Sequence, residues 1–198
     1  MVFVINCKKL TMNILISIFI LFFPFLLFAD NISDFEIEGI SIGDSLLDHF
    51  SKEEIIKNKR NNWYLNTDGK FMASQFYPDQ KSIYEALAIH FKTNDKNFIV
   101  EGVSGGIFYK KNFKECYLKQ KEIAKEISSL FQKSDWKNSE YEDSDGKYTN
   151  IYMNIESNGR ISIQCFDWNS ITEKEKNWTD NLRLTIKSEE FAIWLDKY

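Results

Sequence analysis

The sequence predicts an α+β fold in which helices pack on one face of an antiparallel sheet. Short runs of alternating apolar residues recur along the chain, as they do in half-buried strands. Turn pairs such as Asp68-Gly69 and Asn158-Gly159 separate these runs, which favours hairpins over parallel strands. A long amphipathic helix is predicted between the two groups of strands. Together these features indicate helix-then-strand units, and two such units in tandem are a further hypothesis.

The N-terminal segment, residues 1–29, is predicted to be a secretory signal peptide. Lys8 and Lys9 precede an apolar run over residues 14–28, and the small residue Ala29 stands before a polar segment. This order of basic, apolar and small residues predicts export, with cleavage after Ala29. We therefore expect a periplasmic or secreted protein.

Two alternatives stay open at this end of the chain. The apolar run is shorter than the roughly 20 residues of a membrane span, but an uncleaved N-terminal anchor is the alternative to cleavage. Translation from Met12 would lose both lysines, so Met1 is the favoured start. Cys7 lies before the apolar run, whereas a lipid-bearing cysteine would follow it.

Residues 30–198 are expected to form one domain, which is long enough for a sizeable core. Loss of Lys8 and Lys9 changes the net charge from −4 to −6, and such an acidic domain lacks the basic footprint of a nucleic-acid-binding protein. Cys116 and Cys165 remain after cleavage. In an oxidising compartment they can form a disulfide, and the alternative is a pair of buried thiols.

The start of this domain is predicted to hold two short helices before the first strands. Asp44 is the expected cap of the first, and Ser51 with Glu54 forms a capping box for the second. Strands should follow, because Leu87, Ile89 and Phe91 alternate with smaller or polar residues.

The central helix has the clearest pattern in the chain. Asn112 and Glu115 form its expected capping signature. Its apolar stripe has spacings of three and four residues and consists of Phe113, Cys116, Tyr117, Ile123, Ala124, Ile127, Leu130 and Phe131. Beyond it, alternation predicts a hairpin over residues 151–165, a strand over 182–186, and a short helix capped by Ser188.

A weak internal repeat divides the domain into units 37–109 and 112–198. "YLNTDGKF" at 64–71 resembles "YEDSDGKY" at 141–148, and each is followed by alternating strands. The alternative is that Asp-Gly-Lys is simply a common hairpin turn.

The stretch "IEGISIGDSLLDHF" at 37–50 resembles the opening of small exported helix-plus-sheet modules, the BamE-type outer-membrane assembly lipoproteins and the beta-lactamase inhibitory proteins. The resemblance covers this stretch and the order of elements, and the chain is otherwise similar to exported bacterial proteins in general. It implies an exported α+β fold, and it bears on fold and compartment more than on activity. No binding residue can be carried over, and the lipid-anchor cysteine of the lipoproteins is missing.

The pattern Gly102-Val103-Ser104-Gly105-Gly106 matches the nucleophile elbow of serine hydrolases. An elbow needs a tight turn from strand to helix and a histidine after the serine, but His49 and His90 both precede Ser104. We therefore expect a bulge or a bend before the central helix, where Ser104→Ala is harmless and bulky replacements of Gly105 or Gly106 impair folding.

No cofactor or metal site is predicted. Alignment of "EDSDGKY" on a calcium loop puts Tyr141 and Tyr152 where acidic ligands belong. Histidines and cysteines lack zinc spacing. The favoured function is a non-enzymatic exported module that is protein-binding or envelope-associated, with an envelope protein as its candidate partner. The alternatives are a small hydrolase using scattered carboxylates or His90, and a small-ligand binder that would need an apolar pocket.

Overall fold

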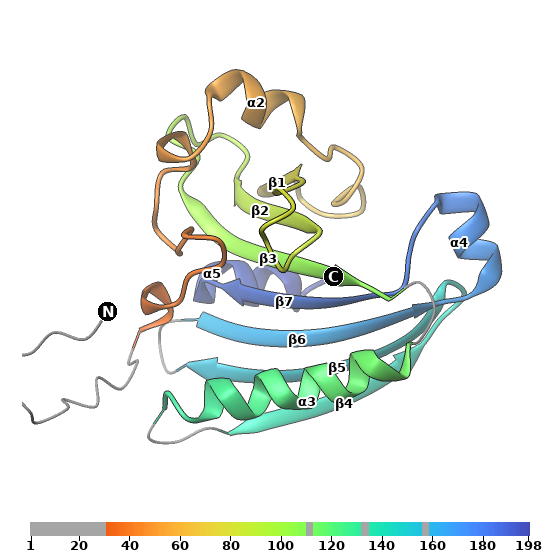
Figure 1. The fold of residues 1–198 in the computed structure, drawn as a ribbon. Helices are drawn as coiled ribbons and strands as arrows, with labels where there is room; N and C mark the ends of the chain where they lie inside the picture. The colour runs from red at the N-terminus through yellow and green to blue at the C-terminus, as the bar shows by residue number, and fades with distance from the viewer. Residues whose placement is uncertain (1–30, 110–112, 132–134, 156–158) are drawn as a thin grey trace, which may run out of the picture.

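The computed structural model describes residues 31–109, 113–131, 135–155 and 159–198. It confirms the predicted α+β class: a seven-stranded antiparallel sheet has the order β1-β2-β3-β7-β6-β5-β4 (Figure 1). The last strand of the chain therefore lies beside β3, in the middle of the sheet. The strands are β1 (Phe71–Phe76), β2 (Ala86–Lys92), β3 (Val100–Phe108), β4 (Trp136–Glu142), β5 (Gly146–Ile155), β6 (Gly159–Trp168) and β7 (Asn181–Lys187).

Helices lie on both faces of the sheet. Figure 1 shows α3 in front of the sheet and α5 behind it. The sequence predicts helices on one face, and α5 departs from that arrangement because Phe191 and Trp194 pack on Phe71, which points to the opposite face from α3. The helices are η1 (Ile32–Asp34), η2 (Leu46–Asp48), α2 (Lys52–Lys57), α3 (Lys114–Ser128), α4 (Ser170–Lys176) and α5 (Glu189–Leu195).

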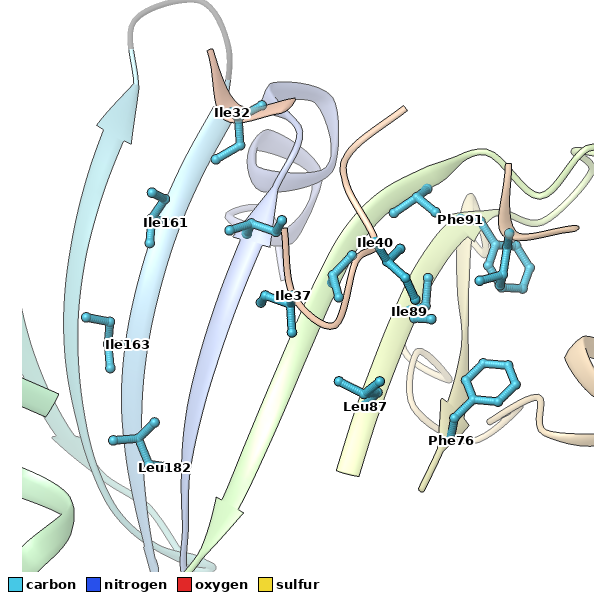
Figure 2. Packing of buried hydrophobic residues seen from close by; sticks show 14 of the residues in the cluster. Ile32, Ile37, Ile40, Phe76, Leu87, Ile89, Phe91, Ile161, Ile163 and Leu182 are labelled. Carbon is cyan, nitrogen blue, oxygen red and sulfur yellow. The ribbon is translucent and has the colours of Figure 1, made fainter. Parts of the chain in front are cut away.

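The main core lies between α3, the N-terminal segment and one face of the sheet, which we call the apolar face. A row of paired apolar residues crosses it from β2 to β5 because strand alternation sends these side chains to one side. Figure 2 shows part of this packing, with Ile37 and Ile40 of the N-terminal segment over β2 and its neighbours. The row consists of Ile89, Val103, Ile186, Ile161 and Met153.

Two kinds of link hold the covering segments to the apolar face. Cys116 of α3 and Cys165 of β6 form a disulfide, with their Cα atoms 6.1 Å apart, which decides between the two alternatives for these cysteines. Gln120 of α3 donates from Nε2 to the carbonyl oxygen of Ile163 at 2.7 Å. The N-terminal segment pairs with β3 through the Val100 N–H, which donates to the Asp44 carbonyl oxygen at 2.9 Å.

The other side of the sheet, which we call the polar face, carries the intervening residues. The row next to the apolar one consists of Ala88, Ser104, Thr185, Ser162 and Tyr152. One residue of displacement along each strand thus changes an aliphatic row into a row of small and hydroxyl-bearing side chains.

Several predicted caps are confirmed and one is wrong. Ser51 and Glu54 form the predicted capping box of α2, and Ser188 caps α5. Asp44 does not cap the first short helix: its carboxylate accepts from the Ser41 N–H, and Ser45 accepts from the Leu47 N–H instead. Asn112 lies outside the described residues.

The predicted hairpins form, but the two Asp-Gly-Lys motifs differ. The β5–β6 pairing is confirmed up to Ile155 and Gly159, although residues 156–158 of the turn lie outside the described part. The motif at 141–148 joins β4 to β5 as a hairpin. The motif at 64–71 lies in a run of turns before β1, so the two copies occupy different structural positions. Whether the units arose by duplication stays a prediction.

Candidate functional site

The polar face is covered by α5 only at one end. There the Phe191 ring lies 4.9 Å from the His90 ring, and a Cβ atom at Gly102 would come within 2.7 Å of Phe191. The glycine is therefore needed for α5 to approach the sheet this closely. In the described part of the chain, the main helix contacts on this face come from α5 and do not extend to β4 or β5, while α4 lies at the far edge with Lys176 over the Trp178 ring. This leaves the part formed by β4, β5 and the adjoining ends of β6 and β7, which we call the open part, as the region where a ligand or partner can reach the sheet.

A chain of aromatic rings, which we call the aromatic strip, runs along the open part. Tyr141 and Tyr148 stack with ring centroids 4.5 Å apart, and Phe166 and Trp168 stack at 5.3 Å. Trp178, in the loop before β7, extends the strip at 4.5 Å from Trp168. Tyr141 and Trp178 are exposed. Rigid aromatic surface of this kind is typical of binding sites, because it buries area at a small cost in side-chain entropy.

A hollow of about 80 Å³ opens on the same face where β2, β3 and β7 meet, and we call it the Ser104 hollow. Its floor is low because small residues stand at Ala86, Ala88 and Gly106. Larger side chains stand around it, from the loop before β1 and from three strands. The lining includes Trp63, Gln75, Ser104, Phe108, Asn181 and Arg183.

Arg183 links the hollow to the aromatic strip. Its guanidinium carbon lies 4.5 Å from the centroid of the Phe166 ring. Among the described residues its nitrogens make no hydrogen bond or ion pair, and no carboxylate influences its pKa, which burial lowers. A cation out of full contact with water and without a counter-charge is costly.

Lys187, four residues after Arg183 on β7, is a second cation with little compensating negative charge. Burial, followed by repulsion from Arg160, lowers its pKa to about 8. The acid that acts on Lys187 is Asp196, and its two carboxylate oxygens each accept from Arg160 at 2.7 Å. The polar face is therefore locally positive, although the domain as a whole is acidic.

The structure brings Ser104 and His90 together. His90 Nε2 lies 3.5 Å from Ser104 Oγ, and Ser104 Oγ lies 2.9 Å from Thr185 Oγ1. On the other side, His90 Nδ1 is hydrogen-bonded to the Tyr64 hydroxyl at 2.7 Å. Burial, then the charges of Arg183 and Lys187, lower the pKa of His90 to about 3, so its imidazole is neutral at pH 7.

This geometry lacks the parts of a nucleophile elbow. Ser104 lies inside β3, where its neighbours on both sides are paired strands, so no strand-to-helix turn presents its hydroxyl. The group that orients His90 is a tyrosine instead of a carboxylate, and burial raises the pKa of that tyrosine. A histidine with so low a pKa is a weak general base. Of the predicted bulge or bend, the bend is wrong, since β3 continues through the glycines to Phe108, whereas a register shift of the bulge kind lies at Glu101, next to Gly102.

Three further buried polar atoms on this face have no hydrogen-bond partner among the described residues. They are the hydroxyl of Ser162, the side-chain carbonyl of Asn150 and the indole N–H of Trp168. Most buried polar groups in proteins are paired, so such clusters need an explanation. A bound ligand or bridging water can satisfy atoms of this kind.

A second cavity, which we call the apolar pocket, lies on the opposite side of the sheet, beneath α3. Its volume is about 450 Å³, within the range of small-molecule sites. The lining is mostly branched aliphatic and aromatic, with Phe35, Ile37, Tyr84, Ile107, Ile123, Ile127, Leu184 and Ile186 among its members. The pocket that the small-ligand alternative requires is therefore present.

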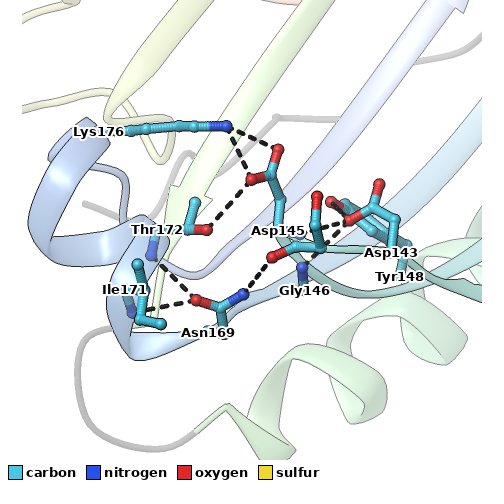
Figure 3. Close-up of polar contacts among 9 residues, drawn as sticks. Asp143, Asp145, Gly146, Tyr148, Asn169, Ile171, Thr172 and Lys176 are labelled. Carbon is cyan, nitrogen blue, oxygen red and sulfur yellow. Dashed lines mark hydrogen bonds and ion pairs between the residues drawn. The ribbon is translucent and has the colours of Figure 1, made fainter.

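The β4–β5 loop, which contains the motif that was aligned on a calcium loop, is held in place by contacts with α4 and within the hairpin. Figure 3 shows Lys176 of α4 reaching the Asp145 carboxylate, with 2.7 Å between Nζ and Oδ2. Asp143 accepts from the Tyr148 hydroxyl at 2.8 Å and from the Asp145 N–H. Asn169 caps α4 and donates to the Ser144 carbonyl oxygen. These contacts hold the hairpin against α4, and no group of three or more potential metal ligands lies together in the described residues.

No helix in the described part of the chain is both long and apolar enough to cross a membrane. Residues 1–29, with the predicted cleavage after Ala29, lie outside that part. No protein-family model, curated protein or solved structure matches this chain. The resemblance to envelope-assembly and inhibitory modules therefore stays a prediction.

Proposed function

We propose that this chain is an exported, non-enzymatic module that binds an envelope protein through the open part of its polar face. The observation that carries the proposal is the aromatic strip, which has exposed rings at Tyr141 and Trp178 and adjoins an uncompensated arginine. Aromatic residues and arginine are the types enriched in the energetic centres of protein interfaces. The disulfide between Cys116 and Cys165 supports an oxidising location.

The test is retention of a partner by immobilised chain after export. Native protein should retain a discrete envelope protein, whereas Tyr141→Ala and Trp178→Ala should lose most of it, because truncating an interface aromatic removes its buried area. The matched control is Leu118→Ala, since Leu118 is equally apolar and 70% exposed on the outer side of α3. Retention that is equal in all four proteins would contradict the proposal, provided that circular dichroism shows native folding.

A second candidate function, binding of a small apolar molecule, rests on the apolar pocket. The neutral fluorescent probe N-phenyl-1-naphthylamine should bind the native chain with enhanced emission. Ile123→Trp should abolish this binding by filling the pocket from α3, whereas Leu118→Trp, on the exposed side of the same helix, should not. Equal binding by both variants would place the probe elsewhere and remove this candidate.

A further inference from the structure

The Ser104 hollow has a shape and a charge that the partner-binding proposal does not explain. Its volume of about 80 Å³ corresponds to a few water molecules. That space can hold one small polar group but no large side chain. Because the floor consists of alanine and glycine, the limit comes from the surrounding side chains rather than from the sheet itself.

Arg183 is the only charged side chain among the described residues that line the hollow. Its guanidinium is fixed against the Phe166 ring at 4.5 Å, so stacking orients the fork before any ligand arrives. In the described residues nothing accepts a hydrogen bond from the Arg183 nitrogens. Because none of them is among the fully buried atoms that lack a partner, they have some contact with solvent and can donate to a ligand.

The neighbouring groups favour an anion over a cation or a neutral ligand. His90 is neutral at pH 7, so it adds no charge beside the hollow. No carboxylate is among the groups that influence its pKa. Ser104 and Thr185 satisfy one another at 2.9 Å, and the Gln75 amide lies on the lining. The Gln75 amide is thus available as a donor beside the cation, and among the described lining residues none is acidic.

We propose that the Ser104 hollow binds a carboxylate attached to an apolar or aromatic group. A guanidinium fork and a carboxylate match in plane and spacing, so the two can form paired hydrogen bonds. The ring surfaces of Trp63 and Phe108 at the hollow would contact the apolar remainder of the ligand. This site does not depend on protein docking at the aromatic strip, since a free acid would bind even if no partner exists.

The test is a titration of the ¹⁵N-labelled exported chain at constant ionic strength. Sodium benzoate should shift the Arg183 Nε–H and Trp63 indole N–H signals in a saturable way, and inorganic phosphate should bind more weakly. A peptide ending in an apolar residue, compared with its C-terminal amide, distinguishes a polypeptide carboxyl terminus from a free acid as the source of the carboxylate.

Variants make the proposal falsifiable. Arg183→Met should abolish the saturable shift. Arg183→Lys should weaken it about tenfold, because the charge remains but the fork is lost. Lys137→Met removes a charge from an exposed position on β4 of the same face and should bind as the native chain does. Unchanged binding in Arg183→Lys, tighter binding of phosphate, or a shift in the Arg183→Met protein would each overturn the proposal; thermal unfolding checks that every variant is folded.

Discussion

The two faces of one sheet differ more than its two halves do. On the apolar face, Ile89, Val103, Ile186 and Ile161 form a paired row beneath α3 and the N-terminal segment. One residue along the same strands, the row contains Ser104, Thr185 and Ser162 and has a helix over only one end. The backbone is shared, so the difference lies in the side chains alone. One face stabilises the fold, and the other has groups available for binding.

The largest expected effect is the loss of the disulfide on the apolar face. Reduction, or Cys116→Ala with Cys165→Ala, should lower the free energy of unfolding by roughly 3–4 kcal/mol, because the bond closes a long loop in the unfolded chain. Its two cysteines are 49 residues apart. Urea unfolding of the oxidised and reduced protein measures the change. Equal stability of the two forms would show that the bond does not restrict the unfolded state.

Neighbouring residues of β6 allow a direct comparison of the faces. Ile163→Ala should cost about 3 kcal/mol, because it opens a cavity in the main core. Ser162→Ala should cost less than about 0.5 kcal/mol, since it removes a buried hydroxyl that has no partner among the described residues. Denaturant unfolding of both proteins gives the two values. A cost for Ser162→Ala as large as that for Ile163→Ala would mean that the polar face also holds the fold together.

Substitution by alanine should affect stability differently at two adjacent glycines of β3, because they face opposite sides of the sheet. A Cβ atom at Gly105 would collide with the Tyr84 ring on the apolar face, whereas at Gly106 nothing lies closer than 3.7 Å. Gly105→Ala should therefore cost about 2 kcal/mol through overpacking, and Gly106→Ala should be nearly neutral. Melting temperatures decide between them. Similar losses at both positions would refute the distinction, and the expectation that bulkier replacements impair folding at either position stays a prediction.

The smallest effect concerns pH. The pKa of Lys187 is about 8 in the folded protein, below its ordinary value of 10.5. Between these values the unfolded chain binds more protons, so the free energy of unfolding should rise with pH. We expect a gain of about 1 kcal/mol between pH 7.5 and 9.5, allowing for partial exposure. Lys187→Met should remove this rise and Lys137→Met should retain it. A rise that persists in Lys187→Met would assign it to another group.

The sequence predicts the buried elements well because their patterns follow from burial. Alternation in β6 and β7 and the stripe of α3 as far as Ile127 each have one apolar side, and the structure confirms them. The end of the predicted stripe is wrong, because α3 ends at Ser128, and Leu130, beyond it, is exposed. β4 is missed because nearly all of its residues are exposed, so neither face carries an apolar signal. α4 is missed for a similar reason: it is short, and its contacts are polar ones to the β4–β5 loop.

The candidate site is harder to predict because it depends on register. Strand alternation places His90 opposite Ile89, as expected, but its meeting with Ser104 also requires the β2–β3 pairing, in which His90 lies opposite Gly102. The isolation of Arg183 depends on which acidic residues turn away from it. That information belongs to the assembled sheet, and no spacing along the chain contains it.

The position of β7 between β3 and β6 constrains the order in which the protein can fold. The contact of Ser104 with Thr185 spans 81 residues, so joining the two halves requires nearly the whole domain to be present. Until β7 arrives, β3 and β6 each expose an unpaired edge of the kind that promotes aggregation. The sheet is therefore completed late in folding, when β7 inserts between β3 and β6. A chain shortened before residue 181 would leave two incomplete sheets.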